Sequence, residues 1–122
     1  MTAPELTPNP TNLPSLQERL LTKARGTNAR RAAETLYGGR DAILRQTAMA
    51  LLSGAELPEH ESPPEATLQL LTGRVRLRGL NREWLLETGD LIPIPPERHS
   101  VTAVEDSVLL LTVRRAAAAQ AG

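Results

Sequence analysis

Hydrophobic and polar residues alternate with a period of two along most of the chain, and turn signals recur about every ten residues between 30 and 113. This pattern is typical of the short strands of a sandwich or barrel, and we therefore expect an all-β domain. The run from Val108 to Val113 is almost wholly apolar, which predicts a central strand covered on both faces. Strands are expected at 32–37, 42–52, 67–72, 90–94, 99–104 and 107–113.

The clearest predicted element is a hairpin between residues 74 and 87. Apolar residues alternate with arginines on its first strand and with glutamates on its second strand. Exposed charge pairs contribute about 0.2–1 kcal/mol each, so they set the strand register more than they stabilise the fold. With a turn at 79–82, the expected cross-strand pairs are Arg74 with Glu87 and Arg78 with Glu83 outside, and Leu77 with Trp84 inside.

The two ends of the chain differ from the β region. Residues 1–14 carry four prolines among Thr and Asn, and we expect a flexible arm there. A capping box that starts at Ser15 predicts a short amphipathic helix over 15–25. Residues 114–122 form an Ala-rich tail that is too short to be a stable helix alone. The organised domain is therefore expected to cover 15–113.

Composition narrows the classes of function. The 122 residues suffice for one domain, and 14 basic residues balance 14 acidic ones, so the charge that dominates nucleic-acid or anionic-membrane binding is missing. With no Phe and no Cys, the chain lacks aromatic stacking platforms, disulfides and thiolate metal sites. It shows neither a signal peptide nor an apolar run of about 18 residues. We expect a soluble cytoplasmic protein with no nucleic-acid or membrane partner.

Two short stretches carry the chain's only two histidines. In the first stretch Gly54 is followed after five residues by His60, and Gly73 closes it. In the second, Gly89 and a proline lead to His99. In this order and at this separation, the stretches resemble the two motifs of small single-domain cupins. The resemblance implies a cupin barrel, a double-stranded β-helix or jelly roll, preceded here by the short helix. It also implies a homodimer, because small cupins commonly pair through their sheets.

The resemblance also implies a metal site, formed in the family by His-x-His, a Glu and the later histidine. Ser62 stands here in place of the second histidine, and Ala66 stands at the usual Glu position. Two imidazoles do not hold a divalent ion firmly. The candidate metal ligands are therefore His60 and His99 with Glu65 as a recruited third, for a weakly held Zn, Fe, Ni or Mn ion. The alternative places Glu65 in a solvated acidic loop at the barrel mouth with Glu56, Glu59 and Glu61.

The same residues predict a ligand cavity. Alternate residues of a strand point the same way, so both histidines are expected to face the barrel interior. The opposite wall is expected to include one face of strand 43–52, with either Arg45 and Met49 or Gln46, and Arg45 is expected outside. In the alternative interpretation the histidines are structural, and their ring nitrogens form hydrogen bonds with Ser62 or with backbone groups. The candidate ligand-binding residues are His60, Ser62, Leu68, Leu70 and His99.

Three functions are compatible with this pattern, because a fold does not set a function. The leading hypothesis is a binding module that holds a small organic ligand in a mainly apolar barrel, with metal weak or absent. The second is a metal-dependent cupin enzyme, an oxygenase or isomerase. The third is a non-catalytic regulatory or structural partner protein. Whether the chain is an enzyme is left open by the sequence.

Overall fold

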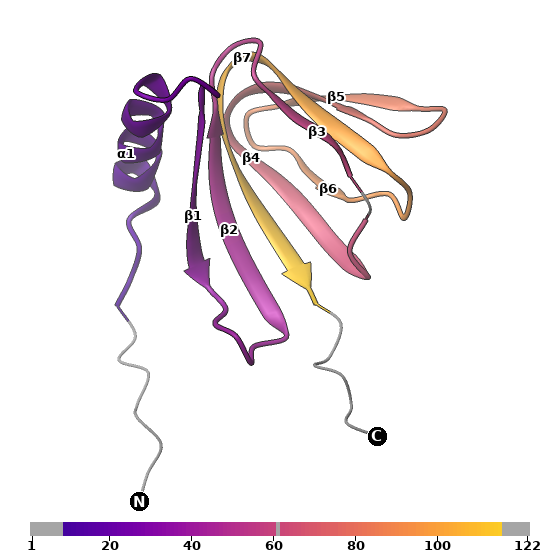
Figure 1. Ribbon diagram of the computed structural model, residues 1–122, viewed down its shortest axis with the longest axis horizontal. Helices are drawn as coiled ribbons and strands as arrows, with labels where there is room; N and C mark the ends of the chain where they lie inside the picture. The colour runs from indigo at the N-terminus through magenta and orange to yellow at the C-terminus, as the bar shows by residue number, and fades with distance from the viewer. Residues whose placement is uncertain (1–8, 61, 116–122) are drawn as a thin grey trace, which may run out of the picture.

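The computed structural model describes residues 9–60 and 62–115 (Figure 1). Most of the arm expected at 1–14 and of the tail expected at 114–122 lies outside the described residues. Within the described residues one helix precedes seven strands. They are α1 (Leu13–Arg25), β1 (Arg31–Tyr37), β2 (Leu44–Leu51), β3 (Glu56–His60), β4 (Glu65–Arg78), β5 (Glu83–Glu87), β6 (Leu91–Pro93) and β7 (His99–Arg114).

Helix α1 begins two residues before the predicted start. The capping residue is Asn12, whose side chain accepts a hydrogen bond from the Ser15 N–H at 2.9 Å, so the prediction that Ser15 caps the helix was wrong. Pro14 fits this earlier start because the first turn of a helix needs no N–H donor. No helix among the described residues is long and apolar enough to cross a membrane.

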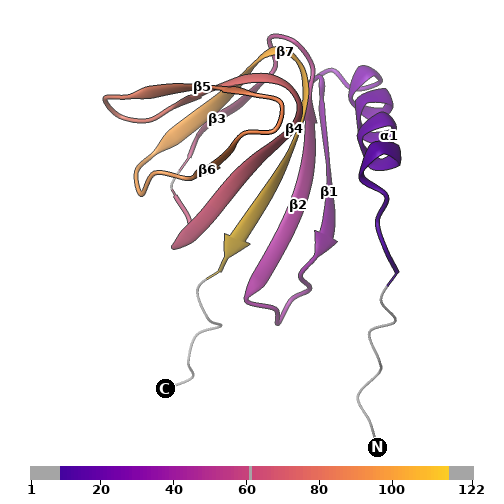
Figure 2. The same ribbon diagram turned by 180° about the vertical axis from the view of Figure 1, so that it is seen from behind.

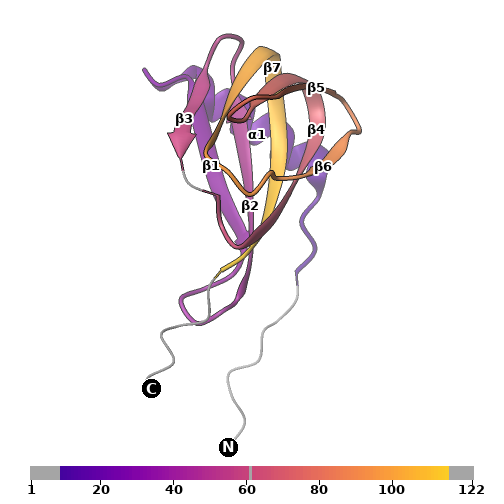
Figure 3. The same ribbon diagram turned by 90° about the vertical axis from the view of Figure 1, so that its right-hand side faces the viewer.

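Two long strands hold the sheet together. Its order is β1-β2-β7-β4-β5, and in addition β3 pairs with β7 and β6 pairs with β4. Because β4 and β7 bend, the sheet folds over itself, with α1 outside β1 and β2 and with β3, β5 and β6 on the other side (Figures 1 and 2). The side view shows β3 and β6 on either side of β7 and β4 (Figure 3). The strands predicted separately at 99–104 and 107–113 are thus one strand, and 67–72 continues into the hairpin.

The bend lies where Gly73 of β4 meets Ser107 of β7. Gly73 has a φ of 100°, and the register between the two strands shifts on both sides of it. Ser107 is fully buried, and its hydroxyl accepts from the Arg74 N–H at 3.0 Å and donates to the Glu105 carbonyl at 2.7 Å. The hydroxyl replaces ladder hydrogen bonds that the bend interrupts.

The sheet packs a separate core on each face. The interior cluster lies inside the fold, and the helix cluster lies between the sheet and α1. On β7, Leu109 belongs to the first and Val108 to the second, which confirms the prediction of a central strand covered on both faces. The interior cluster contains Leu51, Ala55, Leu68, Leu70, Val75, Leu77, Leu86, Ile94, Val101, Ala103 and Leu109. The helix cluster contains Leu16, Leu20, Ala24, Ala48, Ala50, Leu52 and Val108.

The hairpin of β4 and β5 has the predicted register. All three expected pairs form, namely Arg74 with Glu87, Arg78 with Glu83 and Leu77 with Trp84. Trp84 is half-buried rather than inside, because it packs on the interior cluster with one side only. The guanidinium of Arg82 lies 5.1 Å from the centre of its ring and covers part of the remainder.

Candidate functional site

The two histidines lie side by side, one buried and one exposed. His60 ends β3, His99 begins β7, and the two are paired across the strands. Their ring centroids are 4.3 Å apart, with the ring planes at 65°. His99 lies two residues before Val101, a member of the interior cluster, so it faces the same side. The structure thus brings together the two residues that both sequence motifs single out.

Backbone carbonyls determine which nitrogen of each ring carries the proton. The Nδ1 of His60 lies 2.9 Å from the Pro58 carbonyl oxygen, and the Nδ1 of His99 lies 2.9 Å from the Glu97 carbonyl oxygen. A carbonyl only accepts, so in both neutral rings Nδ1 donates and Nε2 keeps its lone pair. No group among the described residues hydrogen-bonds to either Nε2. Each ring therefore offers one free acceptor.

The two rings differ in exposure. His99 is 4% exposed, whereas His60 is exposed at the end of an edge strand. Ser62 bonds to neither ring, because its hydroxyl donates to the Pro63 carbonyl at 3.0 Å. The pair thus forms a small polar patch that is buried on one side and open on the other.

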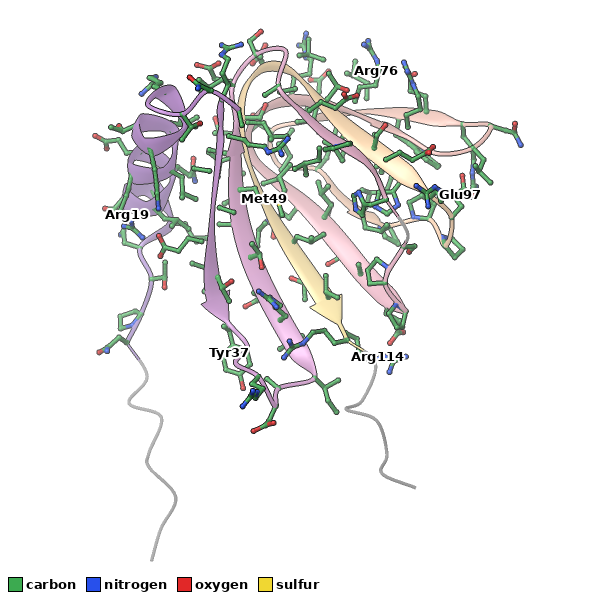
Figure 4. The ribbon with its side chains drawn as sticks, in the orientation of Figure 1. Arg19, Tyr37, Met49, Arg76, Glu97 and Arg114 are labelled. Atoms are coloured by element: carbon green, nitrogen blue, oxygen red, sulfur yellow. The ribbon has the colours of Figure 1, made fainter. Side chains whose placement is uncertain are left out.

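Glu97 holds the buried histidine in place through two different contacts. Its carbonyl accepts from His99, while its carboxylate accepts from the Leu80 N–H at 2.8 Å and from Arg82 at 3.1 Å. The carboxylate fills the space beside Gly79, where a Cβ would lie 2.2 Å from Oε2. Glu97 lies at the end of the fold away from α1 (Figure 4). Glu97 was not singled out from the sequence, so its role as a clamp, which joins the turn of the β4–β5 hairpin to His99, was missed.

The contacts of Glu97 make the stability of the folded state depend on pH. The Leu80 N–H holds the pKa of Glu97 below its ordinary value of 4.5, and the hydrogen bond and charge of Arg82 lower it further, against an opposing effect of burial. A lowered pKa stabilises the folded state above about pH 4.5, and this contribution is lost as the pH falls through the folded pKa.

We therefore expect Glu97→Gln to reduce the free energy of unfolding at pH 6 and to reduce it less at pH 3. Urea unfolding of both proteins at the two pH values measures this difference. Gly79→Ala displaces the carboxylate and is expected to reproduce the effect. An equal loss at both pH values would show that the charge of Glu97 does not contribute.

The other candidate ligand, Glu65, lies away from the histidines. Its carboxylate forms an ion pair with Arg114, the last residue of β7, whereas His99 is the first residue of that strand. The expected acidic loop is also different, because Glu56 and Glu59 lie exposed on β3 and Glu59 pairs with Arg98 at 3.3 Å. Glu61 is outside the described residues.

The possible metal ligands among the described residues do not form a site for the divalent ion that the fold family implies. Within residues 9–60 and 62–115, no group of three His, Cys, Asp or Glu side chains is placed to hold a metal ion. An open catalytic site normally has three protein ligands, and the histidine pair supplies two. Ala66, at the usual Glu position, lies half-buried against the interior cluster.

Two of the candidate ligand-binding residues lie in the core. Leu68 and Leu70 are fully buried and belong to the interior cluster. On β2 the register with β7 turns Met49 inward, and Arg45 shares that face because it pairs with Val113. The expectation that Arg45 lies outside was therefore wrong: it is half-buried, with its guanidinium 3.4 Å from the Thr35 hydroxyl.

Gln46 belongs to the other face of the strand. Its side chain donates to the Thr112 hydroxyl at 3.2 Å, and its neighbours two and four residues on belong to the helix cluster. Of the two faces left open by the sequence, the one with Arg45 and Met49 therefore lines the interior.

Comparison with known proteins identifies the architecture. No family model matches the sequence, and no curated protein matches it either. Among solved structures, a conserved protein of unknown function from Streptococcus pyogenes is similar at 27% identity over 75% of this chain and 80% of its own, with a TM-score of 0.66. A cupin superfamily protein from Desulfitobacterium hafniense is similar at 13% identity, over 70% and 78%, with a TM-score of 0.65.

An enzyme is also among the similar structures. Salicylate 1,2-dioxygenase from Pseudoaminobacter salicylatoxidans shares 21% identity over 82% of this chain, with a TM-score of 0.69, and this chain covers 32% of its length. A likeness at this identity concerns the fold. Together these structures confirm the all-β fold that the two sequence motifs implied. The short N-terminal helix, which was predicted separately from the capping box, is α1.

Proposed function

We propose that this chain, a small protein with the cupin fold, is a binding module that holds a small organic ligand against the histidine pair. The observation that carries the proposal is the pair of Nε2 acceptors without a hydrogen-bond partner among the described residues, on the face of β7 that carries the interior cluster. Sites for small organic molecules are mostly apolar and contain a few polar groups that orient the ligand. Here the two imidazoles are those groups.

The donor set favours this function over a metal-dependent enzyme. The described residues supply two ligands in place of three, and the ion pair with Arg114 engages the candidate third ligand, Glu65. We therefore propose that any metal is weakly held. The homodimer and the cytoplasmic location expected from the sequence are part of the same proposal. Sedimentation of the full chain tests the dimer.

Phenol is a suitable probe because its hydroxyl donates and its ring is apolar. We expect phenol to shift the Nε2 resonances of both histidines and to bind more tightly than benzene, which lacks the donor. Phenol has one donor, so replacing both histidines (His60→Ala with His99→Ala) should weaken phenol binding about three- to tenfold, the equivalent of one hydrogen bond, and leave benzene binding unchanged. The single variants show which of the two rings accepts that bond. Nitrogen-15 NMR titration measures both effects.

The metal content of untagged protein provides the opposing outcome. Stoichiometric iron, zinc, nickel or manganese in the purified wild type, lost in both histidine variants, would replace the binding module by the metal-dependent enzyme. Equal affinities for phenol and benzene would show that the histidines do not orient a ligand.

A further inference from the structure

A groove of about 280 Å³ lies beside the interior cluster, on the side of the fold where two strand edges are free. Among the described residues, β1 pairs only with β2 and β3 pairs only with β7. Residues of these three strands, β1, β2 and β3, line the groove, which we call the edge groove. Its lining residues are Arg31, Ala32, Ala33, Met49, Leu51 and Leu57.

The lining of the edge groove is apolar except at one end. Leu51 belongs to the interior cluster, and both Met49 and Leu57 pack against that cluster while remaining partly accessible. An apolar group placed in the groove would therefore be buried against the core, which is the main source of affinity in small-molecule sites. The volume lies just below the range of about 300–1,000 Å³ typical of ligand pockets, so the ligand is small.

Arg31 supplies the polar end. One guanidinium nitrogen donates to the Glu56 carbonyl at 2.6 Å, which anchors the side chain between β1 and β3. No described carboxylate forms an ion pair with Arg31, and its other guanidinium nitrogens make no hydrogen bond with the part of the chain that the structure describes. A guanidinium with free N–H groups matches a carboxylate, which it binds with two parallel hydrogen bonds.

We infer that the edge groove binds a small monocarboxylic acid, with the carboxylate on Arg31 and an apolar chain or ring over Met49 and Leu57. This inference rests on the proposed function, because the far end of the ligand is expected to contact the histidine pair. Leu57 pairs with Val101 and His60 pairs with His99, so the histidines lie two residues, or about 7 Å, further along β7. An acid whose far end carries a hydrogen-bond donor reaches the free Nε2 acceptors.

The test compares 3-phenylpropionate with 3-phenylpropan-1-ol, which has the same apolar body without the charge, and with acetate, which has the charge without the body. Calorimetric titration of the full chain is expected to show the acid binding about tenfold or more tightly than the alcohol, because a hydrogen bond to a charged group is stronger than a neutral one. Acetate should bind far more weakly than either.

Arg31→Gln should remove the preference for the acid and leave binding of the alcohol unchanged, whereas Arg31→Lys should retain part of it. The matched control is Arg30→Gln. Arg30 is the neighbouring exposed arginine, bonds to the Ser53 carbonyl at 2.8 Å and does not line the groove. Arg30→Gln should leave the binding of 3-phenylpropionate and of 3-phenylpropan-1-ol unchanged.

Different outcomes separate this inference from the function on which it rests. For the histidines the probe is 3-(4-hydroxyphenyl)propionate, whose far end carries a hydroxyl donor. If its binding depends on Arg31 but shifts neither histidine resonance, the groove is supported and the role of the histidines is contradicted. If phenol binds at the histidines but the acid binds no more tightly than the alcohol, the role of the histidines is supported and the edge groove is contradicted. No acid binding, together with a change in sedimentation for Ala33→Trp, would assign the groove to a second copy of the chain and overturn the inference.

Discussion

Replacing Gly73 with alanine is expected to lower the free energy of unfolding by roughly 3–5 kcal/mol, a large share of the stability of a small domain. Two effects add at this position. The φ of 100° is one that L side chains rarely adopt. A Cβ would also lie 2.5 Å from the Asp106 carbonyl oxygen and 2.2 Å from the Ser107 hydroxyl. The bend that closes the fold would have to open.

Two other glycines separate the backbone effect from the steric one. Gly89 has a φ of 95° but nothing within 4 Å of its Cβ position, so Gly89→Ala should cost only the backbone strain of about 1–2 kcal/mol. At Gly39 the Cβ position is free as well and φ is not in the left-handed region, so Gly39→Ala should be close to neutral. Urea unfolding followed by Trp84 fluorescence measures all three.

Removing the serine hydroxyl should not rescue the first variant. In Gly73→Ala with Ser107→Ala, the Asp106 carbonyl and the Ser107 Cα still lie within 2.7 Å of the new methyl group. The double variant should therefore be no more stable than Gly73→Ala. Equal losses for Gly73→Ala and Gly89→Ala would mean that the close approach of β4 and β7 does not limit this position.

The same glycine shows why the number of strands was mispredicted. A glycine between two alternating segments is also what a turn looks like in sequence, so 67–72 and the hairpin were predicted as separate strands. Gly73 instead bends one continuous strand of 14 residues, because β7 continues beside it on both sides. That neighbour is about 30 residues away in the sequence, and local patterns do not contain it.

Strand β3 was missed for a different reason. Its five residues include Pro58 and three charged or ionisable side chains and do not alternate, which is typical of a loop. Within the part of the chain that the structure describes, it pairs only with β7 and is therefore an edge strand, where proline and charge are tolerated and hinder unwanted pairing. The hairpin of β4 and β5, by contrast, depends on neighbours in sequence, and its register was predicted correctly.

The histidines were found from the sequence because motif spacing reports on them directly. The contacts that hold His99 in place were not found from the sequence. The clamp of Glu97 depends on Leu80 and Arg82, which precede it by 17 and 15 residues. The edge groove depends similarly on three strands that meet in space. Motif spacing thus singled out the two histidines that lie together, whereas their orientation and the residues around them required the fold.

The second large effect is expected when the family's metal ligands are restored with Ser62→His and Ala66→Glu. This pair of changes should raise the affinity for Zn²⁺ by roughly 100-fold or more over wild type, because the number of side-chain donors rises from two to as many as four. Ala66 faces the interior, since it packs against the interior cluster on the face that carries Leu68 and Leu70. Calorimetric titration with zinc, iron and nickel measures the gain.

The gain in the restored variant depends on both imidazoles as metal ligands. Adding His99→Ala should abolish the gain. Glu65→Gln, introduced into wild type, should leave the residual metal affinity unchanged because Arg114 already engages that carboxylate. Tight stoichiometric binding by wild type, lost in His60→Ala and in His99→Ala, would contradict a weakly held metal. In that case a further ligand must come from outside the described residues, and Glu61, which follows His60 directly, is the first to replace.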